Sequence, residues 1–116
     1  NQNIKIFYSN YVIKNIKILK DKKFLAFSGI ADNQSFFITL KENNIEVLDT
    51  KEFDDHHKFT EQEILKLTNE AKIRNIELIT TEKNFNNIPE KFKNKIYYTT
   101  LDVTINNNTE FLNEIN

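Results

Sequence analysis

The stretch that decides the fold is Phe24-Leu25-Ala26-Phe27-Ser28-Gly29-Ile30-Ala31-Asp32. Its first four residues form a continuous apolar run, which is typical of a strand buried on both faces, as in a parallel sheet. A tight turn around Gly29 follows, and Asp32 or Asn33 can cap a helix. The stretch therefore predicts a buried strand that leads through a tight turn into a helix.

The same order of strand, polar loop and helix recurs along the chain. The residue pattern predicts a second helix capped at Thr60, and a helical turn that starts at Thr80 and Thr81 and ends before Pro89. Further strands are expected at residues 45–48, 76–79 and 96–103, and a last short helix at residues 110–115. Strands separated by helices imply right-handed crossovers. We expect an α/β fold: a small, mainly parallel sheet with helices on both faces, a Rossmann-like three-layer sandwich.

The N-terminal segment has a different pattern. Residues 4–19 carry β-branched and aromatic residues in partial alternation, which predicts one or two strands. We expect residues 1–22 to form a β ribbon segment and residues 23–116 to form the α/β domain. A chain of 116 residues is long enough for one core and too short for two.

The composition excludes several classes of function. The chain has no cysteine, so it has no disulfide framework and no thiolate nucleophile. It has one glycine, whereas the phosphate-binding P-loop and the dinucleotide-binding turn each need at least two. A formal charge of −1 leaves no basic excess for nucleic acid. No apolar run approaches the ~20 residues that cross a bilayer.

Three polar loops are expected at the carboxyl edge of the sheet, where ligands of parallel α/β sheets bind. They are residues 28–32, 54–58 and 80–83. The second loop contains the only two histidines, His56 and His57, directly after Asp54 and Asp55. Such a group could ligate a divalent metal, provide an Asp–His acid/base pair, or be a solvated loop without a role in chemistry.

The other two loops are candidate anion-binding sites. The hydroxyls of Thr80 and Thr81, together with Lys83, could hold an anion at a helix N-terminus, although helix capping alone also explains these residues. In the first loop, Ser28 and Gly29 form the turn. The glycine either adopts a positive φ or lets another part of the chain approach closely.

The three loops together resemble the C-terminal domain of tetraacyldisaccharide 4'-kinase, the lipid A kinase of Gram-negative bacteria. The resemblance covers residue 23 to the end of the chain. It rests on residues 25–33 with Phe36 and Phe37, on residues 53–60, and on residues 78–83 with Pro89. It implies that the γ-phosphate of ATP is transferred, with Mg²⁺, to the 4'-hydroxyl of a tetraacylated disaccharide 1-phosphate, a lipid A precursor. The expected place is the cytoplasmic face of the inner membrane.

The resemblance also implies how the work is divided between domains. In that family a larger N-terminal domain carries the P-loop, the metal ligands, the catalytic aspartate and the membrane-facing helix, and a two-stranded ribbon joins it to a smaller domain that closes over the site. The Asp–His pair of the family corresponds to Asp55 and His56, and the histidine is expected to help the catalytic aspartate accept the hydroxyl proton. Two positions depart from the pattern. Asp54 replaces the usual proline, and Asn84 replaces the usual aspartate, which puts a charged role there in doubt.

The missing P-loop has a consequence for this chain. Because it also starts at Asn1 and has no methionine, we expect a fragment, inactive by itself, whose partner is its own N-terminal P-loop domain. ATP and Mg²⁺ would be bound mainly by that domain, and no metal ligand is assigned here.

Two other functions fit parts of the sequence. A metal-dependent phosphoesterase could use the Asp-His-His string, but it would need further carboxylates at other strand ends, such as an Asp-x-Asp, and none is present. A catalytically silent α/β binding module, such as a receiver-like domain, would need an acceptor aspartate at a strand end, and the loops offer no clear one.

Overall fold

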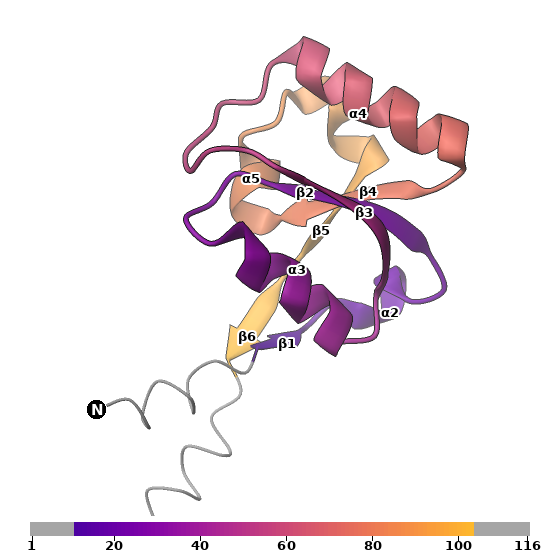
Figure 1. The fold of residues 1–116 in the computed structure, drawn as a ribbon, viewed down its shortest axis with the longest axis vertical. Coiled ribbons are helices and arrows are strands. Elements are labelled where there is room, and N and C mark those ends of the chain that lie inside the picture. Colours follow the sequence, from indigo (N-terminus) through magenta and orange to yellow (C-terminus); the bar gives the residue numbers. More distant parts are fainter. Residues whose placement is uncertain (1–10, 104–116) are drawn as a thin grey trace, which may run out of the picture.

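A parallel sheet of four strands forms the centre of the molecule (Figure 1). In this computed structural model, which describes residues 11–103, the strands lie in the order β3-β2-β4-β5. They are β2 (Lys23–Ser28), β3 (Glu46–Glu52), β4 (Glu77–Thr81) and β5 (Ile96–Thr99). All three neighbouring pairs run parallel. The predicted α/β fold is confirmed, and β2, which carries the apolar run, has a neighbour on each side.

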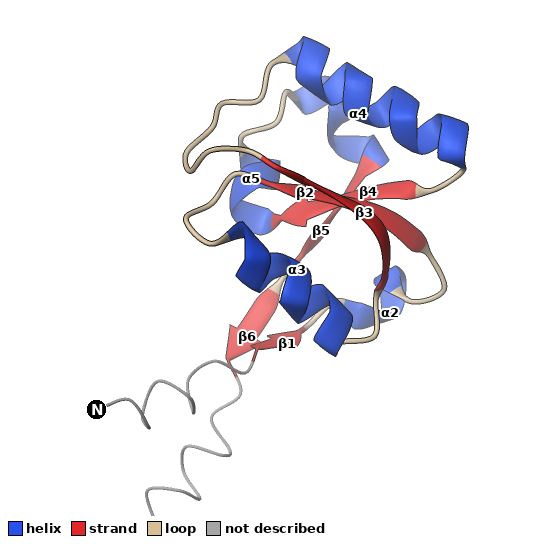
Figure 2. Cartoon of the chain, in the orientation of Figure 1, coloured by secondary structure: helices blue, strands red, loops and turns tan. Residues whose placement is uncertain are grey.

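Helices flank the sheet on both faces (Figure 2). The two long ones are α3 (Asn33–Glu42) and α4 (Glu61–Arg74). Successive side chains of β2 divide between the two faces, because Phe24 and Ala26 pack with α3 whereas Leu25 and Phe27 pack with α4. All four side chains are fully buried. This burial on both faces explains why no polar residue interrupts the run.

Three helices begin at capping residues that are among those the sequence predicts. Asp32 caps α3, Thr60 caps α4, and Thr81 caps the short helix α5 (Glu82–Asn86). At Thr60 the cap is reciprocal. Its hydroxyl accepts the N–H of Glu63 at 3.1 Å, while the Glu63 carboxylate accepts the N–H of Thr60 at 2.9 Å. This capping box satisfies two backbone donors that the first turn of a helix otherwise leaves free.

Replacing Thr60 by alanine is expected to lower the free energy of unfolding by about 1 kcal/mol, because the hydroxyl that accepts the Glu63 N–H is lost. Urea denaturation of the 116-residue chain measures the change. Thr68→Ala is the matched control, since it removes the same atoms from the middle of the same helix, where alanine is the better helix former. Equal losses in the two variants would contradict a specific role for the cap.

After Pro89 the chain forms a 3-10 helix, η1 (Glu90–Lys95), which the sequence pattern does not predict. Its Phe92 is buried in the core on the α4 side, and Ile88 and Phe85 from the preceding segment pack there too. The α4 face of the sheet is therefore closed by η1 and the segment before it as well as by α4.

The predictions for the two ends of the described chain need correction. Residues 16–19 were expected to extend a strand, but they form the helical turn α2 (Ile16–Leu19). Residues 96–103 do not form one strand, because β5 ends at Thr99 and β6 (Leu101–Val103) pairs antiparallel with β1 (Tyr11–Ile13). The expected strand residues 4–10 and the expected helix at residues 110–115 lie outside the described residues.

Asn15 supplies the physical reason for both corrections. Its Oδ1 accepts the N–H of Thr100 at 3.0 Å, and its Nδ2 donates to the carbonyl of Tyr98 at 2.7 Å. The side chain thus holds the start of α2 against the junction of β5 and β6. Beyond it, α2 turns Leu19 into the core on the α3 side, where it is fully buried. Asn15 is separated in the sequence from Tyr98 by 83 positions and from Thr100 by 85. Contacts between such distant residues leave no local signal in the sequence.

Candidate active site

Three loops meet at the carboxyl edge of the sheet, as the sequence predicts. They are the turn between β2 and α3, the loop between β3 and α4, and the junction between β4 and α5. Hydrogen bonds join them directly. The carbonyl of Ser28 accepts the N–H of Phe53 at 2.8 Å, and the Asn84 carboxamide bonds to the peptide groups of Gly29. The three loops therefore form one connected unit.

Gly29 is required for the contact between the first two loops. Its φ is not positive, so glycine is not needed here for a left-handed backbone. A Cβ built at Gly29 would lie 2.7 Å from the carbonyl oxygen of Asp54 and 3.2 Å from the Cβ of His57. Such a distance to a backbone oxygen is a steric clash. The single glycine of the chain is therefore explained by a close approach of the histidine-containing loop.

Asn33 fastens the same two loops from the other side. Its Oδ1 accepts the hydroxyl of Ser28 at 2.6 Å and the N–H of Ile30 at 3.0 Å, and its Nδ2 donates to the carbonyl of Phe53 at 3.0 Å. Ser28, predicted as a possible anion-binding residue, is fully buried. Its hydroxyl is used inside the protein, so the structure does not present it to a ligand.

The two adjacent histidines have different environments. The Nε2 atom of His57 lies 2.9 Å from each carboxylate oxygen of Glu63. Its ring stacks on Phe53, with the centroids 5.0 Å apart, and meets the ring of Phe59 edge-on at the same distance. Its side chain is 28% exposed. His57 therefore anchors the loop to α4.

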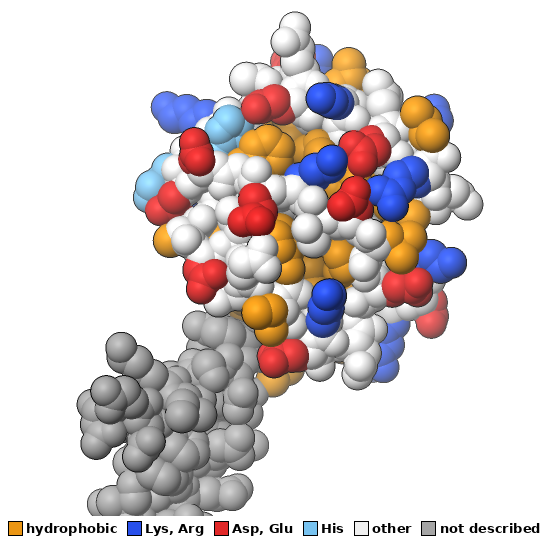
Figure 3. All heavy atoms as spheres, viewed as in Figure 1, with side chains coloured by type: hydrophobic (Ala, Val, Ile, Leu, Met, Phe, Trp, Pro, Cys, Tyr) orange, Lys and Arg blue, Asp and Glu red, His pale blue; other side chains and the backbone are white. Residues whose placement is uncertain are grey.

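His56 has almost none of these contacts. Its side chain is 74% exposed, and its Nε2 atom lies 3.6 Å from the Oδ2 atom of Asp55, which is longer than a hydrogen bond. Its φ of 62° places it in the left-handed region, which is uncommon for a residue other than glycine and occurs often at functional sites. The histidine side chains lie at the surface where this loop projects (Figure 3). The loop thus presents one free imidazole beside a carboxylate.

The third loop is built around buried groups. Thr80 is fully buried, and among the described residues its hydroxyl has no hydrogen-bond partner. The Thr81 hydroxyl accepts the N–H of Asn84 and donates to the Oδ1 of Asn84, both at 3.0 Å. Lys83 is exposed. The structure therefore brings Thr81 to the edge as a cap, leaves Lys83 in solvent, and does not place Thr80 where an anion could reach it.

Asn84 and Asn33 are the site residues that the sequence reasoning did not select. Asn84 was noted only as a departure from an expected aspartate, yet it is 2% exposed and touches two loops. A usable signal did exist, because each asparagine lies at the start of a helix that follows a polar loop. Side chains there can bond to backbone groups outside the helix.

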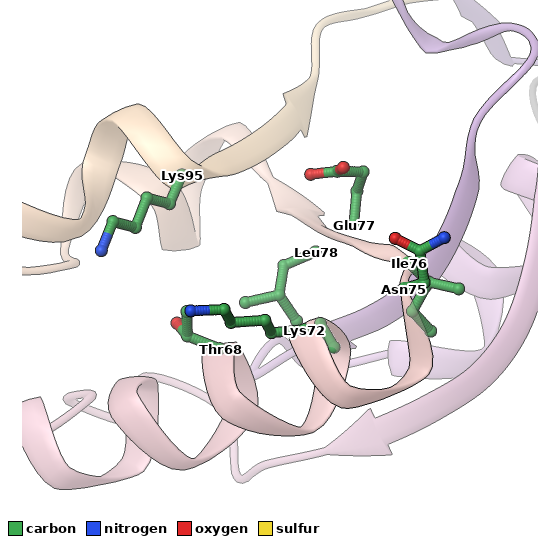
Figure 4. A pocket seen from close by; sticks show the side chains of 8 residues that line it. Thr68, Lys72, Asn75, Ile76, Glu77, Leu78 and Lys95 are labelled. Carbon is green, nitrogen blue, oxygen red and sulfur yellow. The ribbon is translucent and has the colours of Figure 1, made fainter.

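Two hollows lie near different ends of the strands. One, of about 390 Å³, is bordered by Lys72 of α4, Lys95 of η1 and Glu77 at the start of β4, which places it at the amino edge, opposite the histidine-containing loop (Figure 4). The other, of about 400 Å³, is lined in part by Ile30 and Thr81 and therefore lies at the carboxyl edge. Within residues 11–103, no three histidine, aspartate or glutamate side chains come together as metal ligands could.

The Glu63 carboxylate makes the stability of this region depend on pH. The N–H of Thr60, and after it the imidazole of His57, hold the pKa of Glu63 below its usual value, and hydrogen bonds lower the pKa of Asp32 and Asp49 too. A carboxyl whose pKa is lower in the folded chain stabilises the fold above its unfolded pKa, near about 4. That contribution is lost as the pH falls through the lowered pKa.

We therefore expect the free energy of unfolding to decline as the pH falls from about 5 to about 3, a range that begins just above the ordinary carboxyl pKa values and ends below them. Urea denaturation at a series of pH values measures it, and Glu63→Gln, which has no carboxyl at this position, should show a shallower decline. A wild-type stability that is unchanged from pH 5 to pH 3 would contradict the pKa shifts.

The fold and the site define a class of protein: a parallel α/β domain that presents a free imidazole beside a carboxylate at the carboxyl edge of its sheet. The family model of LpxK, tetraacyldisaccharide-1-P 4'-kinase, matches residues 5–116. The chain belongs to this family, as its three loop motifs predict.

Individual relatives agree with the family match. The chain is 30% identical to the tetraacyldisaccharide 4'-kinase of Pelagibacter ubique, over 99% of this chain and 37% of that protein. A stretch of 65 residues is 46% identical to the tetraacyldisaccharide 4'-kinase of Afipia carboxidovorans, covering 56% of this chain and 19% of that one. This chain therefore spans little more than a third of the Pelagibacter relative.

The fold is also similar to a solved structure. A crystal structure of LpxK from Aquifex aeolicus in complex with ATP aligns with a TM-score of 0.52 and 24% identity, covering 85% of this chain and 28% of that one. At this identity the likeness concerns the fold.

Proposed function

We propose that these residues form the C-terminal α/β domain of a kinase that phosphorylates the 4'-hydroxyl of tetraacyldisaccharide 1-phosphate in lipid A biosynthesis. In this proposal the domain closes over the active site of an N-terminal domain and brings the Asp55–His56 pair to it. The family match over residues 5–116 supports the reaction. The antiparallel β1 and β6 strands, which leave the domain together, suit a connecting ribbon.

The observation that carries the proposal is the contrast between the two histidines. His57 is held by Glu63 and two phenylalanine rings, whereas His56 is 74% exposed on a left-handed backbone at the carboxyl edge. An exposed imidazole on an anchored loop can contact a group from another domain without any rearrangement of the domain that carries it. Such a residue would join the reaction only after closure.

The chemistry requires a proton acceptor. The 4'-oxygen forms a bond to the γ-phosphorus of ATP, the bond from that phosphorus to the bridging oxygen breaks, and ADP leaves with the electron pair. The hydroxyl proton goes to a base. We assign this proton to an aspartate of the N-terminal domain that pairs with His56, while the carboxylate of Asp55 adds negative charge beside the imidazole. Positioning and charge stabilisation supply most of the catalysis in phosphoryl transfer. A proton acceptor held in place by an imidazole adds to the rate.

The described residues do not suit ATP and Mg²⁺ as a binding site of their own. The chain has one glycine and therefore no P-loop. Within residues 11–103 no three carboxylate or imidazole side chains come together as metal ligands could. We therefore propose that a P-loop domain binds both groups, and that this chain alone transfers no phosphate.

The proposed substrate is an acylated lipid, which connects the proposed reaction with a membrane. In the part of the chain that the structure describes, no helix is both long and apolar enough to span a bilayer. We propose that the whole enzyme works at the cytoplasmic face of the inner membrane, where the acylated disaccharide would be presented, and that contacts outside these residues hold it there.

The experiment is a transfer assay with the full-length protein. Purified enzyme, ATP labelled in its γ-phosphate and tetraacyldisaccharide 1-phosphate should yield labelled lipid, and the 116-residue chain alone should yield none. A full-length protein that is folded but forms no labelled lipid would overturn the proposal. No observation in the described residues favours the phosphoesterase alternative, because the Asp-His-His string has one of its histidines already paired with Glu63.

A further inference from the structure

Asn84, on the five-residue helix α5, bonds through its side chain to the backbone of a distant turn. Its Oδ1 accepts the N–H of Gly29 at 2.9 Å, and its Nδ2 donates to the carbonyl of the same residue at 3.3 Å. The Oδ1 also accepts the hydroxyl of Thr81 at 3.0 Å. Both ends of the carboxamide are therefore used, and the side chain is almost fully buried.

We propose that Asn84 is a positioning residue for His56. It fixes the position of the turn at Gly29, and this turn fixes the position of the loop that carries the imidazole. This inference rests on the proposed function. Asn84 touches neither histidine in the described contacts, so its effect would be transmitted through backbone.

The path from Asn84 to His56 is short and stiff. The Asn84 carboxamide holds both backbone polar groups of Gly29, its N–H and its carbonyl. Gly29 in turn lies against the Asp54 carbonyl, so close that no Cβ fits between them. Asp54 accepts the N–H of His57 at 3.1 Å, which closes the turn with His56 inside it. A shift of Gly29 would therefore move the turn that contains His56.

The carboxamide suits this task because Gly29 offers one donor and one acceptor. Alanine at position 84 would leave a buried N–H and a buried carbonyl without partners, which is costly. Aspartate would still accept from the N–H of Gly29, but when ionised it could not donate to the carbonyl. Alanine therefore removes both hydrogen bonds to Gly29, whereas aspartate removes only the one to the carbonyl.

The first readout uses the fact that Gly29 is the only glycine in the chain. Labelling the 116-residue protein with [¹⁵N]glycine gives a single amide signal, which reports on this turn alone. We expect Asn84→Ala to speed the hydrogen exchange of that amide at least 10-fold and to shift the ring signals of His56. Asn84→Asp should keep most of the amide protection. Asn86→Ala, an exposed position on the same helix, should change neither.

The second readout is a double-mutant cycle in the full-length enzyme. We expect Asn84→Ala to lower kcat on the order of 10-fold with little change in KM, because a catalytic group is misplaced while substrate binding remains. The Asp variant should recover part of the loss. In a His56→Ala background the Asn84 substitution should have no further effect on kcat, since it acts through the missing imidazole.

The outcomes separate this inference from the proposed function. An unchanged Gly29 exchange rate in Asn84→Ala, or an equal loss of kcat in both backgrounds, overturns the positioning role while leaving the kinase assignment intact. A His56→Ala enzyme with wild-type turnover overturns the role of His56 itself, and the positioning role that depends on it. If Asn84→Ala does not fold, the Asp variant is put through the same double-mutant cycle, and an equal loss of kcat in the wild-type and His56→Ala backgrounds overturns the inference.

Discussion

On the proposed function, replacing His56 by alanine in the full-length protein is expected to lower kcat by roughly 10²-fold, the scale of lost acid/base assistance. The reason is geometric. His56 is the exposed imidazole of the carboxyl edge, and its contact with Asp55 is loose enough to be replaced by one to another domain. Steady-state rates at saturating ATP and lipid measure the effect. Because the side chain packs against little in the domain, stability should barely change.

His57→Ala is the matched control, since it removes the same imidazole one residue away. It should cost stability, because it deletes the contacts with Glu63, Phe53 and Phe59. At a temperature where the protein is folded, its kcat should remain within a few-fold of wild type, well short of the loss of roughly 10²-fold expected for lost acid/base assistance. If the two variants exchange these behaviours, the assignment of roles to the histidines is wrong.

Replacing Gly29 by alanine is expected to lower the free energy of unfolding by about 1–3 kcal/mol, the usual cost of forcing extra atoms into a packed site. The new Cβ would meet the Asp54 carbonyl oxygen, which belongs to the backbone and cannot rotate away. Relief requires the histidine-containing loop to move. Denaturation of the 116-residue chain measures the stability, and the ring signals of His56 report the movement.

Ala31→Ser provides the control for Gly29→Ala, because it adds one atom to an exposed residue of the same turn. Its stability should stay within about 0.5 kcal/mol of wild type. A Gly29→Ala protein as stable as the control, with unmoved His56 signals, would show that the close approach to Asp54 is not a constraint.

The parts of the fold that follow from neighbouring residues could be predicted from the sequence. The apolar run from Phe24 to Phe27 predicts an inner strand because burial on both faces demands it. The helix caps could be predicted because a helix start is a local event. Thr60 was predicted to the residue, whereas Asp32 and Thr81 were each predicted as one of two neighbours. The parallel orientation of the strands and the shared edge of the loops follow from these elements.

The features that depend on distant residues could not be predicted. The helical turn α2 was expected as a strand, since nothing near it reveals the bonds of Asn15 to the end of β5. The role of Gly29 stayed open between two readings until the neighbouring loop was placed against it. The loop residues alone did not separate His56 from His57, and only the family resemblance selected His56. The contact that holds His57 could not be predicted, because its partner Glu63 lies on α4.

The departure at Asn84 has a physical meaning in this chain. An aspartate there, which the family resemblance leads one to expect, would offer acceptors only. The asparagine uses its donor on the Gly29 carbonyl and its acceptor on the Gly29 N–H. The position is thus a structural clamp that works without charge.

The most direct test of the role of His56 is the turnover of the full-length His56→Ala enzyme measured with and without added imidazole. The proposed role predicts a low rate that imidazole in solution partly restores, with no such restoration in His57→Ala. Wild-type turnover of His56→Ala in the absence of imidazole would contradict it.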